Sequence, residues 1–123
     1  MIGSALGSGH HSEVRHCKNI TNSIVRAVKI YNKNKMNEYQ HSRLKQDIYI
    51  SSRLSHPGIL KLYELYEDEK RYYLVMECLT GGELYEKFEK EGMFCEEECC
   101  KIMTQIVSAV VYLHKNKVVH RNL

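Results

Sequence analysis

The sequence predicts an α+β fold, in which a five-stranded antiparallel sheet carries one helix and is followed by two further helices. Short runs rich in β-branched and aromatic residues, separated by turn residues, indicate the strands. One segment with a helical period interrupts these runs, and only helical periods follow them. The length of 123 residues, with 43% hydrophobic and 27% charged residues, is typical of one small globular domain.

The first three predicted strands run from Ile2 to Leu6, from Glu13 to Cys17 and from Ile24 to Ile30. A turn that contains glycine joins the first two. The third run reads Ile-Val-Arg-Ala-Val-Lys-Ile, and its β-branched, mostly apolar composition favours a central strand. The polar, lysine-rich segment from Asn32 to Glu38 is predicted to be a solvated connection.

A helix is predicted from Tyr39 to Leu54, because residues at helical spacing collect on one face. That face consists of Leu44, Ile48, Ser51 and Leu54. Ser51 breaks the apolar stripe, and burying an unpaired hydroxyl there would cost roughly 1–3 kcal/mol. We expect Pro57 to end the helix, since proline disfavours the helical conformation of the residue before it.

The segments Ile59 to Tyr66 and Arg71 to Glu77 predict a hairpin around a charged turn. A short helix is predicted from Glu83 to Glu91, with Gly92 as its terminator. A longer helix is predicted from Glu96 to about His114. Its expected apolar face consists of Cys99, Met103, Ile106, Val110 and Leu113.

Composition argues against several classes of function. The formal net charge of +3 comes from interspersed basic and acidic residues, so no nucleic-acid surface is predicted. The longest apolar run, Ile106 to Leu113, is too short to cross a bilayer, so no membrane partner is predicted. The five cysteines lack the spacing of a disulfide framework or a structural zinc site. With no signal peptide recognised, we expect a cytoplasmic location, with the nucleus as the alternative.

The turn Gly7-Ser8-Gly9 lies between the first two predicted strands. Glycines at such a turn let backbone amides approach a phosphate group closely. A dinucleotide-binding fold would need a helix after the glycines, whereas a strand is predicted here. A plain glycine turn remains the alternative.

Lys29 lies within the third predicted strand, between Val28 and Ile30. Because side chains alternate along a strand, Lys29 points to the opposite face from these two neighbours. The alternative to a binding role is a lysine at the edge of the sheet whose side chain reaches water.

Four motifs, taken together in their order, resemble the ATP-binding half of a eukaryotic protein kinase domain. They are Leu6 to Val14 with its glycines, Val25 to Lys29, Leu74 to Leu84 with Thr-Gly-Gly-Glu-Leu, and His120 to Leu123. The residues of these motifs are most similar to those of calmodulin-dependent and calcium-dependent Ser/Thr kinases. The resemblance implies a small lobe and hinge over residues 1–79, and the start of a large lobe over 80–123. We expect the chain to be truncated after the last motif.

The same resemblance implies a set of ATP-binding residues. They are Leu6, Gly7, Ser8, Gly9 and His10 in the glycine loop, Val14 and Ala27 around the adenine, Lys29 at the phosphates, Met76, Glu77 and Leu79 at the hinge, and Glu83 at the ribose. Within that loop, His11 replaces the usual aromatic residue at the tip. No metal ligand of the family falls within the chain, so Mg²⁺ is expected only in a complete domain.

Three positions carry the implied catalytic chemistry. Lys29 would pair with Asp47, where the family has a glutamate. Asn122 occupies the position of the aspartate that accepts the substrate hydroxyl's proton. An amide cannot take that proton, and losing a positioned base typically costs about 10²–10⁴ in rate.

Two functions follow from these expectations. In the first, the chain is the ATP-binding part of a Ser/Thr kinase domain that acts on a protein substrate. In the second, it belongs to a pseudokinase, a nucleotide-binding or scaffolding module with a protein partner and no catalysis. We expect the 123-residue chain alone to transfer no phosphate.

Overall fold

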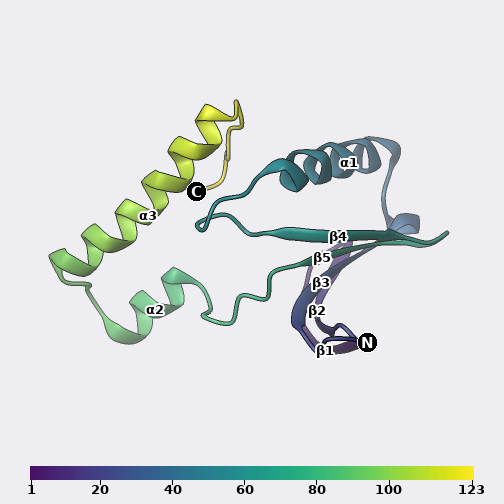
Figure 1. Ribbon diagram of the computed structural model, residues 1–123, viewed down its shortest axis with the longest axis horizontal. Helices are drawn as coiled ribbons and strands as arrows, with labels where there is room; N and C mark the ends of the chain where they lie inside the picture. The colour runs from purple at the N-terminus through teal and green to yellow at the C-terminus, as the bar shows by residue number, and fades with distance from the viewer. The chain divides into compact units, whose positions relative to one another are not determined.

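The computed structural model describes residues 1–123 and has five strands, three α-helices and one short 3-10 helix (Figure 1). The elements are β1 (Ile2–Ser8), β2 (Ser12–Lys18), β3 (Val25–Asn32), η1 (Lys33–Lys35), α1 (Glu38–Arg53), β4 (Leu62–Glu67), β5 (Arg71–Met76), α2 (Leu84–Glu91) and α3 (Glu96–Lys115). The strands form one antiparallel sheet in the order β1-β2-β3-β5-β4. The predicted sheet with its inserted helix is therefore confirmed.

The chain divides into two compact units. The sheet unit comprises Met1–Arg53 and Leu60–Cys78, and the helical unit comprises Leu54–Ile59 and Leu79–Leu123. All five strands and α1 belong to the sheet unit, whereas α2 and α3 belong to the helical unit. None of the helices combines the length and the apolar character needed to cross a membrane.

The core of the sheet unit lies between α1 and one face of the sheet (Figure 1). Leu44 of α1 is buried against Tyr72 and Leu74 of β5. Partly buried apolar side chains surround this contact, namely Tyr31, Met36, Ile48, Leu62 and Met76. Burying a large apolar side chain contributes about 1.5–3 kcal/mol, so α1 is held on the sheet mainly by this cluster.

At the C-terminal end of α1, the observed apolar face differs from the expected one. The helix ends at Arg53, so Leu54 lies beyond it and belongs to the helical unit. Ser51 is only partly buried, and no buried side-chain oxygen or nitrogen lacks a hydrogen-bond partner. The expected cost of burying an unpaired hydroxyl therefore does not arise, because the last turn of the helix reaches solvent.

The hairpin of β4 and β5 also differs from its predicted bounds. Strand β4 begins at Leu62, whereas the sequence predicted a strand from Ile59. The Ile59 N–H donates to the His56 carbonyl over 3.0 Å, which closes a turn and removes Ile59 from the ladder. At the other end, the Asp68 carboxylate accepts bonds from the Lys70 and Arg71 amides, both 2.7 Å long.

In the helical unit, α3 packs on the short segment Leu54–Ile59. The Ser55 N–H donates to the Tyr112 hydroxyl over 2.9 Å, and His56 Nε2 lies 3.1 Å from Ser108 Oγ. Leu113 is buried.

The covered face of α3 is rotated from the expected one. Its buried and partly buried residues are Ile102, Ile106, Ala109, Val110, Tyr112 and Leu113. Cys99 and Met103, which the sequence placed on this face, are exposed. Ile106, Val110 and Leu113 lie on the expected face, whereas Ile102 and Ala109 extend the covered side in place of Cys99 and Met103.

Candidate functional site

The glycine turn connects β1 and β2. Gly7 lies opposite Val14 in the β1–β2 ladder, and the Gly9 N–H donates to the Ser12 carbonyl over 2.7 Å. No atom lies within 4 Å of the position that a Cβ on Gly7 would take. The backbone at Gly7 is thus open to a bulky group such as a phosphate.

Lys29 lies on the side of the sheet that faces α1. It is in register with Val14 of β2 and with Leu74 of β5, and Leu74 belongs to the core beneath α1. The side chain is partly buried, and its ammonium lies 5.2 Å from the ring centroid of Tyr31. No carboxylate lies within ion-pair distance of Lys29. Its positive charge is therefore free to meet an anion.

Asp47 is exposed on α1 and forms no ion pair. The contact that the resemblance implied between Asp47 and Lys29 is thus not made in this structure. Aspartate is one methylene shorter than glutamate, so from the same helix position its carboxylate reaches less far toward β3.

Ala27 and Met76, expected near the adenine and at the hinge, lie two residues along the strands from Lys29 and Leu74 on the same face. Ala27 is 5% exposed and pairs with Met76, which is partly buried. The Glu77 N–H donates to the Lys61 carbonyl over 2.9 Å, which fixes the backbone just after β5. The sheet unit thus brings together Val14, Ala27, Lys29 and Met76 on one side.

The sequence did not indicate a contact of the Cys78 thiol, which lies beside this segment. The Cys78 Sγ lies 3.5 Å from the Nδ1 atom of His16, and both side chains are partly buried. Because the two residues are 62 positions apart, no local pattern could have linked them.

The remaining predicted residues belong to the helical unit. Leu79 is 66% exposed. Glu83 precedes α2, and its N–H donates to Glu86 Oε2 over 3.2 Å. Asn122 is exposed, and its N–H donates to His120 Nδ1 over 3.2 Å. Between them Arg121 has a φ of 69°, in the left-handed region that most residues avoid.

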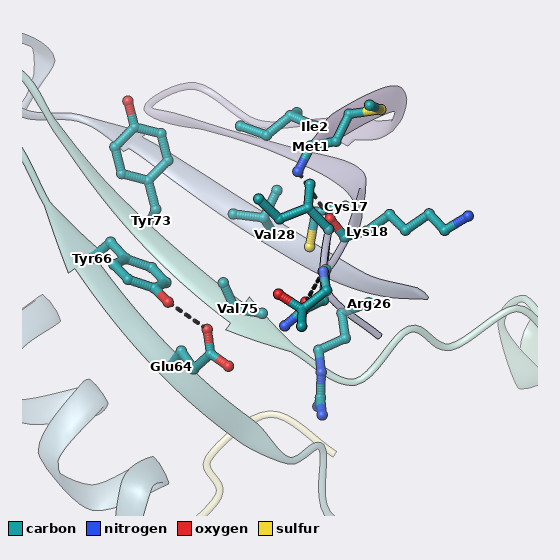
Figure 2. A pocket seen from close by; sticks show the side chains of 13 residues that line it. Met1, Ile2, Cys17, Lys18, Arg26, Val28, Glu64, Tyr66, Tyr73 and Val75 are labelled. Atoms are coloured by element: carbon teal, nitrogen blue, oxygen red, sulfur yellow. Dashed lines mark hydrogen bonds between the residues drawn. The ribbon is translucent and has the colours of Figure 1, made fainter. Parts of the chain in front are cut away.

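A cavity of about 390 Å³ lies on the face of the sheet that points away from α1 (Figure 2). It is lined by paired residues of that face, among them Cys17 with Arg26, and Val28 with Val75. Burial raises the pKa of the Cys17 thiol. None of the predicted ATP-binding residues lines this cavity, and no sequence motif indicated it.

Glu64 and Tyr66 are among the polar residues that line this cavity (Figure 2). The Tyr66 hydroxyl donates to Glu64 Oε2 over 2.7 Å. This bond to the carboxylate raises the pKa of Tyr66, since ionising the phenol would break it. No group of three or more His, Cys, Asp or Glu side chains that could hold a metal ion occurs in the structure.

Comparison with known proteins gives the family. The sequence matches the family model of the protein kinase domain over residues 1–123. The chain belongs to the protein kinase domain family. The resemblance drawn from the four motifs is thereby confirmed, and the sheet unit and helical unit are consistent with a kinase small lobe followed by the start of a large lobe.

Several curated relatives are similar over nearly the whole chain. Calcium-dependent protein kinase 5 of Plasmodium berghei is 44% identical over 118 residues, which are 96% of this chain and 21% of that protein. Myosin light chain kinase A of Dictyostelium discoideum is 37% identical over 96% of this chain and 40% of its own length. Aurora kinase B of Xenopus tropicalis is 35% identical over 99% of this chain and 34% of its length. The chain thus spans about a fifth to two fifths of these relatives.

Proposed function

We propose that this chain is the ATP-binding part of a Ser/Thr protein kinase domain of the calcium-dependent kinase type. The observation that carries the proposal is the placement of Lys29. Its ammonium has no carboxylate partner and lies on the α1-facing side of the sheet, opposite Val14, which follows the glycine turn. Kinase domains in general bind ATP with Mg²⁺, and both the free cation and the open glycine turn fit a triphosphate.

The proposed roles follow from the chemistry of each group. Lys29 donates to phosphate oxygens as a charge-assisted contact, and the backbone around Gly7 approaches the same anion. Ala27 and Val14 offer small apolar surfaces for a flat base. When bound, ATP supplies the phosphoryl group that the complete domain transfers to a protein hydroxyl.

The test is a titration of the full-length protein with a non-hydrolysable ATP analogue and Mg²⁺. We expect Lys29→Met to weaken binding about 10- to 100-fold, because one charge-assisted contact is lost. Lys101→Met is the matched control, since Lys101 forms only an exposed pair with Glu97 on α3. Unaltered binding by Lys29→Met would place the phosphate site elsewhere.

A pseudokinase is the second candidate, and two observations favour it. Asn122 carries an amide where the family uses a carboxylate, and Asp47 makes no ion pair with Lys29. A full-length protein that binds the ATP analogue yet transfers no phosphate to peptide substrates would support this function. Measurable turnover would support the kinase.

A further inference from the structure

The glycine turn and α1 are joined by a side-chain contact outside the predicted site. The Nε2 atom of His11, at the tip of the turn, lies 3.3 Å from the Nε2 atom of Gln40 in the first turn of α1. Both side chains are partly buried. The two residues are 29 positions apart, so the fold and not the local sequence brings them together.

The orientation of the Gln40 amide is fixed by the start of the helix. The Asn37 N–H donates to Gln40 Oε1 over 2.9 Å, and the Gln40 N–H donates to Asn37 Oδ1 over 2.9 Å. This reciprocal pair is a capping box. A backbone N–H can only donate, so the atom of Gln40 that faces it must be the oxygen. The NH₂ group of Gln40 therefore faces His11.

The orientation of Gln40 determines the protonation of His11. Because the amide NH₂ can only donate, the His11 Nε2 atom must accept. The imidazole is then neutral and carries its proton on Nδ1. A proton on His11 Nε2 would face the Gln40 NH₂ group, itself a donor, and would have only His10 Nδ1, 3.2 Å away, as an acceptor.

Further contacts hold the turn in this position. The His11 carbonyl accepts from the Asn32 N–H of β3 over 3.1 Å. The ring of His10 meets that of His11 edge to face, with centroids 4.3 Å apart and an interplanar angle of 75°. The His10 Nδ1 atom lies 3.3 Å from His11 Nδ1 and 3.2 Å from His11 Nε2. With Gln40 donating to Nε2, His10 Nδ1 is the acceptor for a proton on His11 Nδ1. The charged groups that line the small cavity on the sheet side of this turn are Glu13, Lys35 and Arg71. None of these three is hydrogen-bonded to His11, whose side-chain partners are Gln40 of α1 and the neighbouring His10.

We infer that His11 is a positioning residue that latches the glycine turn to the N-terminal cap of α1. The latch consists of the Gln40 NH₂ group donating to the neutral His11 imidazole. One consequence of the latch rests on the proposed function. If the turn contacts the nucleotide phosphates, the latch links its position there to the position of α1. An aromatic residue at position 11, usual in the family, offers no such acceptor.

The first test reads the tautomer of His11 by ¹⁵N magnetic resonance of the full-length protein labelled at histidine, with His11→Gln to assign the signal. We expect the proton on Nδ1. In Gln40→Glu the carboxylate can accept from both Asn37 and His11, so the His11 proton should appear on Nε2. A proton on Nε2 in the unaltered protein, or no change in Gln40→Glu, would overturn the latch.

The second test measures amide hydrogen exchange at Gly9 and Asn32, whose N–H groups are bonded within and beside the turn. His11→Phe keeps a ring of similar size and leaves the capping box intact, but removes the acceptor. We expect exchange to rise about two- to tenfold, as for the loss of one neutral hydrogen bond. His11→Gln restores an acceptor and should return exchange to near the original rate. Equal exchange in all three proteins, or equal acceleration in both variants, would overturn the latch.

A third measurement, of nucleotide binding, separates this inference from the proposed function. If the unaltered protein binds the ATP analogue, His11→Phe should weaken binding a few fold and His11→Gln should not. Failure of the unaltered protein to bind would refute the proposed function, while the tautomer and the exchange rates would still decide the latch.

Discussion

The sheet unit and the helical unit differ in how much apolar surface they bury. Of the eight buried apolar residues, six lie in the sheet unit and only Leu54 and Leu113 lie in the helical unit. The sheet unit pairs strands that are distant in sequence and covers one face with α1. Both units expose large apolar side chains, and in the helical unit these include Leu84, Phe88, Met103, Val107 and Val111. Substitutions of buried apolar residues should therefore lower the stability of the sheet unit. Substitutions of exposed apolar residues in the helical unit should change its surface and leave its stability nearly unaltered.

The largest expected effect belongs to Asn122 in the helical unit, the position at which the proposed function expects a proton acceptor. In a full-length protein that retains measurable transfer, Asn122→Asp should raise the rate by about 10²–10⁴, because a carboxylate can accept the hydroxyl proton. ATP-analogue binding should stay nearly constant. The measurement is phosphate incorporation into a peptide substrate. An unchanged rate would show that the amide at position 122 does not limit transfer, and would leave the missing contact between Asp47 and Lys29 as the next candidate cause.

The next effect concerns the core of the sheet unit. Leu74→Ala should lower the free energy of unfolding by about 2–5 kcal/mol, since it leaves a cavity beneath α1. Val107→Ala on α3 should change it by no more than about 0.5 kcal/mol, because Val107 is 52% exposed. Denaturant titration of both variants compares the two units directly. Equal losses would contradict the contrast in burial.

A smaller effect should come from the exposed side of α3. Met103, Val107 and Val111 are spaced by four residues and are 52%, 52% and 44% exposed. Such a stripe favours association. We expect the 123-residue chain to form oligomers in light scattering, and the double substitution Met103→Lys and Val107→Lys to reduce them. A monomeric unaltered chain would show that this stripe does not drive association.

The smallest effect is a pH dependence at the β4–β5 turn. The Tyr73 hydroxyl, 2.8 Å away, and two backbone amides donate to Asp68 and hold the pKa of its carboxyl below the usual range. Because the folded pKa lies below the unfolded one, the stabilisation is complete above the unfolded pKa. It is lost as the pH falls through the folded pKa.

Denaturant titrations between about pH 5 and pH 2 should detect this loss in the unaltered protein. In Asp68→Asn the stability curve should be flatter over the same range, since the amide does not titrate. Parallel curves for the two proteins would assign the acid sensitivity to other carboxyl groups.

The sequence predicted the sheet and all three α-helices because these depend on local composition and period. It failed where a contact between distant residues decides the outcome. Ile59 is apolar enough for a strand, yet a bond to His56 turns it away from the sheet. The covered side of α3 depends on where residues 54–59 pack, which the helical period alone does not determine.

In the candidate site, too, local features were predicted from the sequence and contacts between distant residues were not. Motif order predicted the family, and the alternation of side chains along a strand placed Lys29 on the opposite face from Val28 and Ile30. It could not show whether Lys29 and Asp47 meet, because that depends on the distance between α1 and β3. The pair His11 and Gln40, the pair His16 and Cys78, and the cavity on the outer face have no sequence signature.

The strand order also sets an order of events during folding. Strands β1, β2 and β3 pair with their neighbours in sequence, as do β4 and β5, so these contacts close short loops. The pairing of β3 with β5 joins Val28 to Val75, 47 positions apart. Long loops carry a larger entropic cost of closure, which slows the pairing of distant strands. Joining the two halves of the sheet should therefore be the late, rate-limiting step, with α1 settling on the core as they meet.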